Sequence, residues 1–288
     1  MPHEPSDGAS LPSPRPPGGL AAPGAFLALT VALSIPFWVL GALRPRELLP
    51  GLPVSALMTC CPAAAALVLT RHRAGGAGAR ALLHRAVDVG RVASPRWLLA
   101  AALLIPALTL LGYGVLRVAG RPLPPADIAP GATLALTAVF LVAALGEELG
   151  WTGYALPALR AHHGPWSAAL TIGLAWAAWH VPSLVQAGRA VGWIAWWALG
   201  TVAMRVLLVW LHERGGESVF LVALAHATSN VAWQSFPVHG SHYDVRVGAV
   251  VTLLAAALLP PLGGGGRRDG GRDGDRGGAS VLRRPRAR

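Results

Sequence analysis

The sequence predicts an all-α polytopic membrane protein, a bundle of about eight transmembrane helices. Three observations predict this class. The chain has 288 residues, of which 53% are hydrophobic and only 13% charged. Its mean hydropathy is +0.50, whereas about a quarter of the residues in an ordinary soluble domain are charged. The apolar residues also gather in runs of nearly uniform length, separated by short polar segments.

Each apolar run is close to the length that crosses a bilayer. A helix rises about 1.5 Å per residue, so roughly 20 residues span a hydrocarbon core of about 30 Å. A soluble protein of this size could not bury so many uniformly apolar helices, whereas lipid covers them without further protein. Internal prolines such as Pro36, Pro106 and Pro182 are tolerated in spanning helices. The eight predicted runs are 25–43, 53–70, 97–118, 132–149, 166–186, 193–211, 218–235 and 245–262.

The composition divides the chain into a central bundle and two tails. Residues 1–23 are rich in Pro, Gly and Ser and read as a flexible cytoplasmic tail rather than a secretory leader. Residues 263–288 are almost entirely Gly, Arg and Asp, which cannot form a core, so a disordered basic tail is expected. The bundle is expected over 24–262, and the segment 71–96 between its second and third helices is read as a loop.

The arginines predict the orientation. All 24 basic residues are arginine, and the net charge is +11. With eight spans, 17 arginines fall on the side of the two termini, six on the other side, and Arg205 inside a span. The positive-inside rule therefore places both termini in the cytoplasm and the protein in the cell membrane. Because the charges lie scattered between apolar runs, a nucleic-acid partner is not expected.

A few ionisable and amide side chains fall inside the predicted spans, where a charge costs several kcal/mol and marks function by default. Residues four apart share a helix face, so His226 lies above Asn230, and Trp176 above His180. Glu147 and the following Glu148 point about 100° apart, so only one can face a common centre. The polar set is Glu147, Glu148, His180, Arg205, His226 and Asn230.

Four of these groups, Glu147, His180, His226 and Asn230, could converge from three helices on one pocket. A carboxylate and an imidazole can share a water molecule and remove its proton. A second imidazole and an amide can donate hydrogen bonds to a developing oxyanion. Together they would form a peptide hydrolase that needs no covalent nucleophile.

Three short motifs then resemble those of the CPBP intramembrane proteases, also called Abi or CAAX prenyl endopeptidase type 2. The resemblance covers roughly 130–235. Residues 210–214, with Gly216 and Ser218, are similar to the usual lead-in to the third motif. The three motifs are Glu-Glu-Leu-Gly-Trp-Thr-Gly-Tyr at 147–154, Trp-Ala-Ala-Trp-His at 176–180 and His-Ala-Thr-Ser-Asn at 226–230.

The resemblance implies an eight-helix membrane protease whose polar cavity opens toward the cytoplasm. By it, Glu147 would be the general base and His180 would help to activate the water. His226 and Asn230 would stabilise the oxyanion, with Glu148 structural or assisting. The substrate would be a peptide or protein, possibly membrane-anchored, whose identity and cleavage position the sequence leaves open.

The catalytic type stays open between a glutamic and a metal-dependent protease. Glu147, His180, His226 and a water would satisfy tetrahedral zinc. The favoured reading has no metal and no cofactor, because Asn230 is a poor zinc ligand but is well spaced to act with His226 as an oxyanion donor.

One departure from the family pattern concerns Glu148. The first motif usually reads Glu-Glu-x-x-x-Arg, and Thr152 stands where that arginine is expected. Either Glu148 is protonated or another cation reaches it, and Arg205 is the candidate. Glu148, Arg205 and Trp176 are therefore expected to support the site. Thr152 also favours the alternative function, a non-catalytic immunity or regulatory protein that binds a peptide partner in the same cavity.

Overall fold

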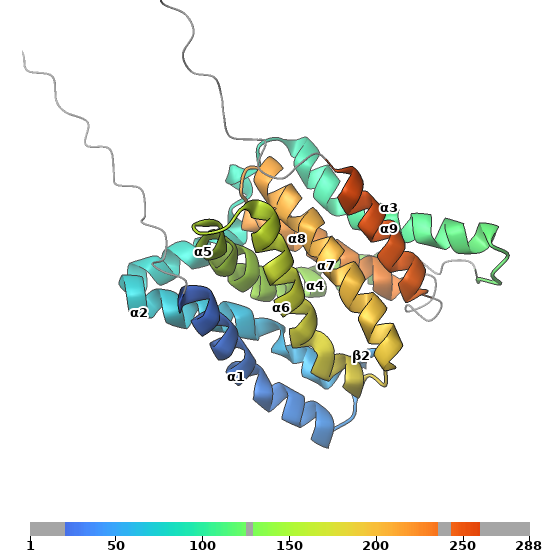
Figure 1. The fold of residues 1–288 in the computed structure, drawn as a ribbon, viewed down its shortest axis with the longest axis horizontal. Helices are drawn as coiled ribbons and strands as arrows, with labels where there is room; N and C mark the ends of the chain where they lie inside the picture. The colour runs from blue at the N-terminus through green and yellow to red at the C-terminus, as the bar shows by residue number, and fades with distance from the viewer. Residues whose placement is uncertain (1–20, 125–128, 236–242, 260–288) are drawn as a thin grey trace, which may run out of the picture.

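The computed structural model describes residues 21–124, 129–235 and 243–259 of the chain, and these form a bundle of long helices (Figure 1). Successive long helices run in opposite directions. They are α1 (Ala21–Leu43), α2 (Cys61–His84) preceded by the 3-10 helix η1 (Val54–Cys60), α3 (Pro95–Val118), α4 (Pro130–Gly150) continued by the π-helical turn η4 (Trp151–Ala155) and α5 (Leu156–Arg160), α6 (Pro165–Gln186), α7 (Val191–Arg214), α8 (Val219–Ser235) and α9 (Val245–Leu258).

The predicted class is confirmed: the chain is an all-α, multi-pass membrane bundle. Among the described residues six helices are long and apolar enough to cross a bilayer. Two further helices of the bundle, α8 and α9, are shorter, with 17 and 14 residues. Eleven of the 17 residues of α8 are buried, and α8 packs against α3, α4 and α7. Protein therefore covers most of this helix, which does not need a long lipid-facing surface.

Two predicted boundaries were wrong. The segment 71–96 is not a loop throughout, because α2 continues to His84 across a kink at Gly75, whose φ is +65°. Arginine and alanine favour helix, but the arginines and histidines of this segment lower the hydropathy, so the apolar pattern ends before the helix does. The first tail is shorter by three residues, since α1 begins at Ala21. The rest of 1–23 and all of 263–288 lie outside the described residues.

Small residues set the spacing of the helices around α4. A Cβ on Gly150 would lie 2.6 Å from the backbone of Pro62, and one on Gly146 would lie 2.8 Å from the carbonyl oxygen of Thr59. These glycines, four residues apart, let α4 approach η1 and α2 closely, as small residues do between membrane helices. The pair brackets Glu147 and Glu148 and so fixes their depth in the bundle.

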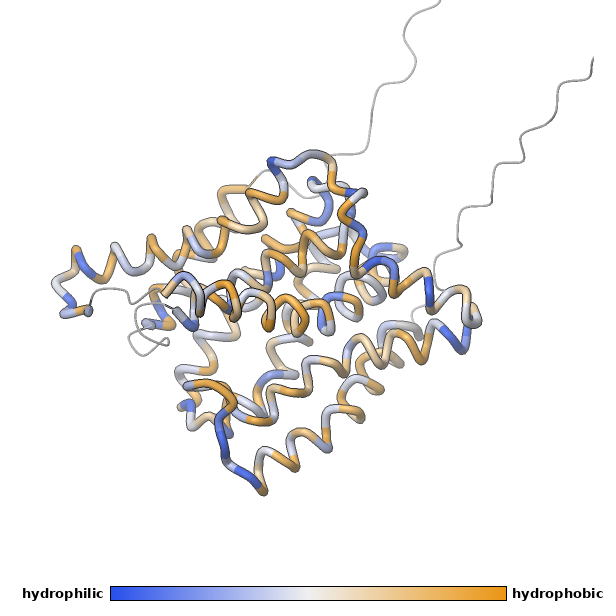
Figure 2. Tube along the Cα trace, turned by 180° about the vertical axis from the view of Figure 1, so that it is seen from behind, coloured by the Kyte–Doolittle hydropathy of each residue, from blue (hydrophilic) through white to orange (hydrophobic). Residues whose placement is uncertain are grey.

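The two ends of the bundle differ in composition. We call 85–94, 160–164 and 213–218 the arginine-rich end. There the Ser218 hydroxyl donates to Asp88 (2.7 Å) and Arg160 pairs with Glu213 (3.0 Å). Figure 2 shows hydrophobic residues along the helices and the most hydrophilic stretches near helix ends.

The opposite end, which we call the mouth end, consists of residues 44–53, 187–190 and 243–244. It holds a small antiparallel hairpin, β1 (Glu47–Leu49) and β2 (Leu52–Pro53), which the sequence did not predict. Its turn uses Gly51 at φ +73°, where an added Cβ would meet the rings of Trp233 and the guanidinium of Arg189. Only glycine suits both this backbone conformation and this close approach.

Candidate active site

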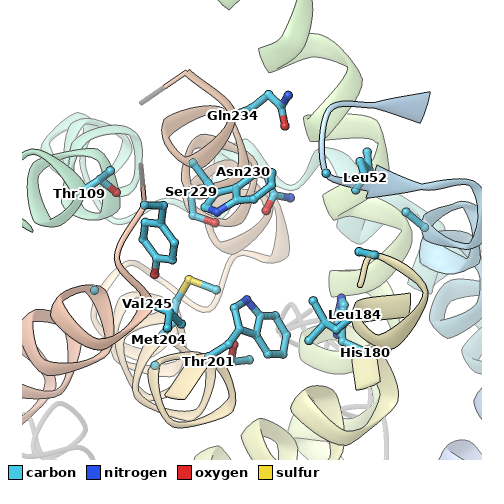
Figure 3. A pocket seen from close by; sticks show the side chains of 18 of the residues that line it. Leu52, Thr109, His180, Leu184, Thr201, Met204, Ser229, Asn230, Gln234 and Val245 are labelled. Atoms are coloured by element: carbon cyan, nitrogen blue, oxygen red, sulfur yellow. The ribbon is translucent and has the colours of Figure 1, made fainter. Parts of the chain in front are cut away.

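A cavity of about 570 Å³ lies within the bundle, with walls from α3, α4, α6, α7, α8, α9 and the hairpin. All four predicted groups, Glu147, His180, His226 and Asn230, line it. Figure 3 shows His180 and Asn230 at this space, with Thr201 and Met204 of α7 beside it. Most of the remaining wall is apolar or aromatic. The predicted convergence in space is therefore observed, while the catalytic roles stay predictions.

Glu147 lies near the end of α4 and is buried. Its Oε2 accepts a hydrogen bond from the indole Nε1 of Trp176, at 2.6 Å. This N–H comes from a different helix, α6, so it holds the carboxylate in one orientation at the cavity wall. The sequence placed Trp176 beside the pocket but did not predict this bond.

His180 is oriented by its own helix. Its Nδ1 lies 2.9 Å from the backbone carbonyl oxygen of Trp176, one turn earlier. A carbonyl oxygen only accepts, so Nδ1 carries the proton of this bond. In the neutral ring Nε2 is then a free acceptor. The ring also packs edge-on against Trp179, with centroids 4.8 Å apart, which restricts its rotation at the cavity.

His226 is oriented by the second glutamate. Its Nδ1 lies 3.0 Å from Oε1 of Glu148, and the described residues supply no partner for Nε2. The carboxylate–imidazole pair fixes the ring in the way that a buried acid fixes the histidine of a hydrolytic triad. Asn230 follows one turn later on α8 and lines the same cavity.

Glu148 does not line the cavity. Its carboxylate makes a bidentate pair with Arg205 of α7, at 2.8 and 3.0 Å, and both side chains are almost completely buried. The Thr152 hydroxyl donates to the same carboxylate. The predicted partnership of Glu148 with Arg205 is thus confirmed. Arg205, from the neighbouring helix α7, thus supplies the positive charge that the family pattern would place four residues after Glu148, at position 152.

Comparisons with known proteins agree with these motifs. Residues 129–232 match the family model described as type II CAAX prenyl endopeptidase Rce1-like. A protein of Methanococcus maripaludis named CAAX prenyl protease 2 is 25% identical over 126 residues, 41% of this chain and 46% of that protein. The aligned part therefore spans less than half the length of this relative. Residues 129–232 are thus similar to the CPBP family.

In this segment Trp176 is the central side chain. Its ring carries the guanidinium of Arg205 on one face, 4.3 Å from the centroid. The rings of His226 and His180 meet it edge-on, at 5.0 and 5.5 Å. Gly173, one turn earlier, lets α6 approach α7 beside Arg205. One indole thus links the glutamate, both histidines and the buried arginine.

The first of the three motifs, at 147–154, also includes an unpredicted π-helical turn. Residues Trp151–Ala155, directly after the paired glutamates, form η4 between α4 and α5. Such turns insert one extra residue per turn and often occur at functional sites. Hydropathy alone carries no signal for this turn, because its residues are compatible with an ordinary helix.

The zinc alternative can be tested against the donor geometry. Within the part of the chain that the structure describes, no three His, Cys, Asp or Glu side chains group closely enough to hold a metal ion. The ring of Trp176 packs against both imidazoles, and its N–H donates to Oε2 of Glu147. Glu147, His180 and His226 therefore do not fit a zinc site in this arrangement.

Proposed function

We propose that this protein is an intramembrane endopeptidase that hydrolyses a peptide bond of a membrane-associated substrate with an activated water. One observation carries the proposal: three helices bring a carboxylate, two imidazoles and a carboxamide to the wall of one cavity. Ionisable groups in spanning helices cost free energy, so their presence there indicates a function. The match of this segment to a prenyl endopeptidase family supports the same reaction class.

Water activation is assigned to Glu147 and His180. The carboxylate of Glu147 and the Nε2 lone pair of His180 are both acceptors at the cavity wall. Either can take a proton from a water placed between them, which contributes about 10²- to 10⁴-fold to the rate. The indole N–H of Trp176 keeps the carboxylate in position.

Oxyanion stabilisation is assigned to His226 and Asn230. Since Nδ1 of His226 already donates to Glu148, its Nε2 donates to an oxyanion when the ring is an imidazolium. The neighbouring carboxylate compensates that charge. The side-chain amide of Asn230 supplies a second donor. Within low-dielectric walls each such donor is worth about 10²- to 10³-fold in kcat.

We propose a metal-free reaction. The support is the donor arrangement, in which the indole of Trp176 lies among the three side chains that zinc would need. Activity of the purified protein should persist after treatment with a strong chelator and dialysis. Activity lost under chelation and restored by Zn²⁺ would overturn this part of the proposal.

The alternative, a non-catalytic peptide binder, has lost its main support. That reading was favoured by Thr152, because Glu148 appeared to lack its cation. Arg205 supplies the cation with two short contacts, so the supporting half of the site is complete.

The test uses the full chain in lipid nanodiscs with a panel of membrane-anchored peptides, one of them carrying a prenylated C-terminus. Mass spectrometry of the products should show one preferred cleavage position. Glu147→Gln and His180→Ala should abolish product, whereas Glu47→Gln, an exposed glutamate on the hairpin, should not. Peptide binding without product from the unaltered protein would contradict the proposal and support the binder.

A further inference from the structure

The connection between α7 and α8 is held by the segment that joins α2 to α3. The backbone N–H of Ala93 donates to the carbonyl oxygen of Gly215 at 2.9 Å. The guanidinium of Arg85 donates to the carbonyl oxygen of Glu217 at 2.7 Å. The connection belongs to the lead-in at 210–218, a motif of the sequence to which the proposed reaction gives no role.

Asp88, in the same joining segment, satisfies the first turn of α8. Its Oδ1 accepts a hydrogen bond from the backbone N–H of Phe220 at 3.0 Å, and its Oδ2 accepts one from that of Val219 at 3.2 Å. The Ser218 hydroxyl donates to Oδ1 of Asp88 at 2.7 Å and accepts from the N–H of Leu221 at 3.1 Å. A helix leaves its first four N–H groups without intrahelical partners, so three of the four are satisfied here.

The carboxylate of Asp88 is an anchor rather than a solvated charge. Its side chain is only 7% exposed, and Nε of Arg85 donates to its Oδ2 at 3.0 Å. Ser218 and Val219, which it binds, are fully buried. A buried donor that loses its partner costs free energy, so removal of the carboxylate should open or displace the start of α8.

Packing along the sides of α8 does little to fix its position along its own axis. Ala225 lies in one apolar cluster with Ala101 of α3, and Ala223 and Ala227 lie in another with Ala144 of α4. Such small side chains let helices approach closely, but they interlock little and resist axial sliding weakly. The cavity borders a further face of the same helix. The axial position of α8 therefore depends on its first turn.

That axial position decides whether His226 reaches Glu148. Phe220 precedes His226 by six residues, which is about 9 Å of helix. The bond between Nδ1 of His226 and Oε1 of Glu148 measures 3.0 Å, and such bonds extend to about 3.2 Å. A shift of α8 by about 1 Å would break this bond and displace Asn230 at the cavity wall, and misplacement on that scale can cost about 10²-fold in rate.

We propose that Asp88 is a positioning residue: its carboxylate fixes the start of α8 and thereby holds His226 against Glu148 and Asn230 at the cavity wall. Asp88 lies outside 129–232, the segment that matches the protease family model. It does not line the cavity, so it acts through α8. Its effect on a reaction rests on the proposed function above, whereas its effect on the placement of His226 does not.

The first experiment reads the position of His226 without using activity. In the full chain with isotope-labelled histidine, NMR should show the Nδ1 proton shared with Glu148 far downfield, in a signal assigned by its loss in His226→Gln. Asp88→Ala should move this signal toward the position of an imidazole without that bond. Asp88→Asn keeps one acceptor oxygen, so its shift should be smaller.

Phe26→Leu is the matched control for a general loss of stability. Phe26 is fully buried in α1, and no described residue of α1 lines the cavity. This variant should lower the melting temperature and leave the signal of His226 unchanged. An unchanged signal in Asp88→Ala, or an equal change in Phe26→Leu, would overturn the proposal. If Asp88→Ala does not fold, Asp88→Asn decides by the same criterion.

The second experiment separates positioning from stability in the proposed reaction. Below the unfolding range, Asp88→Ala should lower kcat by up to about 100-fold for a peptide that the unaltered protein cleaves, while KM stays nearly constant because no group at the cavity is changed. Asp88→Asn should restore part of kcat, and Phe26→Leu should retain it. An unchanged kcat, or a rise of KM alone, would overturn the positioning role while the peptidase proposal stands. If the unaltered protein cleaves no peptide, the peptidase proposal fails, and the signal of His226 by itself decides the role of Asp88.

Discussion

Glu147 and Glu148 are adjacent in the chain and lie in opposite kinds of surroundings. Glu148 is enclosed, with hydrogen bonds from Arg205, Thr152 and His226 that occupy both carboxylate oxygens. Glu147 has one such donor, Trp176, and otherwise faces the cavity. The helical rotation of about 100° per residue separates the two environments.

The difference favours Glu147 over Glu148 for the role of general base in the proposed reaction. A carboxylate with both oxygens occupied by cationic and hydroxyl donors is a poor base and a strong structural anchor. A carboxylate with a free oxygen at a cavity wall can accept a proton from water. Under the proposed function, the paired glutamates combine a reacting group with its support, and the two functions should separate on substitution.

Glu147→Gln gives the largest expected effect. The substitution keeps the size of the side chain and removes the base, so kcat should fall by about 10²- to 10⁴-fold with an unchanged melting temperature. Single-turnover peptide cleavage and thermal unfolding in detergent measure the two quantities. A large loss of thermal stability would show that Glu147 is also an anchor and would break the comparison.

Glu148→Gln should act mainly on stability. It leaves the guanidinium of Arg205 buried without its counter-charge, and breaking a buried pair costs about 3–5 kcal/mol. Arg205→Met should cost a similar amount, whereas the double variant should be more stable than either single one. Thermal unfolding of all four proteins tests this; additive losses would mean that the two side chains are not coupled.

A rescue experiment tests whether Arg205 replaces the motif arginine. In the Arg205→Leu background, Thr152→Arg places a cation four residues after Glu148, on the same helix face. The space vacated by Arg205 lies beside it, so part of the lost stability should return. Thr152→Met in the same background is the control, and equal recovery with methionine would show that packing rather than charge is responsible.

Much of this site could be predicted from the sequence, because it depends on local rules. Helical spacing placed His226 with Asn230 and Trp176 with His180, and the scarcity of charge in spans singled out Arg205. The absence of a cation at Thr152 led directly to Arg205 as partner of Glu148. These inferences needed only the period of the helix and the cost of burying an unpaired charge.

Other features depend on contacts between distant segments and left no local signal. The indole of Trp176 is one of 11 tryptophans, and nothing in its motif distinguishes a donor to Glu147 from a packing residue. The turn of the hairpin at the mouth lies close to Trp233 and Arg189, which come from distant parts of the chain. Which helices supply the wall of the cavity is a property of the whole bundle, which the spacing of residues within one helix cannot give.

Gly150 tests whether the depth of α4 keeps the two environments apart. Gly150→Val should force α4 away from Pro62, with a loss of roughly 1–3 kcal/mol for overpacking. Gly114→Val is the matched control, because a Cβ on Gly114 meets nothing within 4 Å. Thermal unfolding reports stability, and kcat should fall as well if Glu147 shifts. Equal effects at the two glycines would show that helix propensity alone is responsible.

The smallest expected effect on substrate cleavage comes from Arg189. This arginine lines the cavity, as Glu147 does, whereas Arg205 is enclosed, as Glu148 is. Arg205 is buried against a carboxylate, whereas Arg189 lines the mouth and has no acidic partner within salt-bridge distance among the described residues.

A partly exposed ion pair contributes up to about 1 kcal/mol, so Arg189→Gln should raise KM for a peptide with an acidic residue near the cleavage position by no more than roughly fivefold. Its kcat should not change, because Arg189 precedes α7 at the mouth end and makes no contact with Glu147 or His180 that would place it in the proposed reaction. Arg246→Gln, an exposed arginine of the same end that does not line the cavity, is the control. A neutral peptide should show no difference between the variants, and an equal rise of KM for acidic and neutral peptides would assign Arg189 to packing on Trp193 instead of to charge recognition.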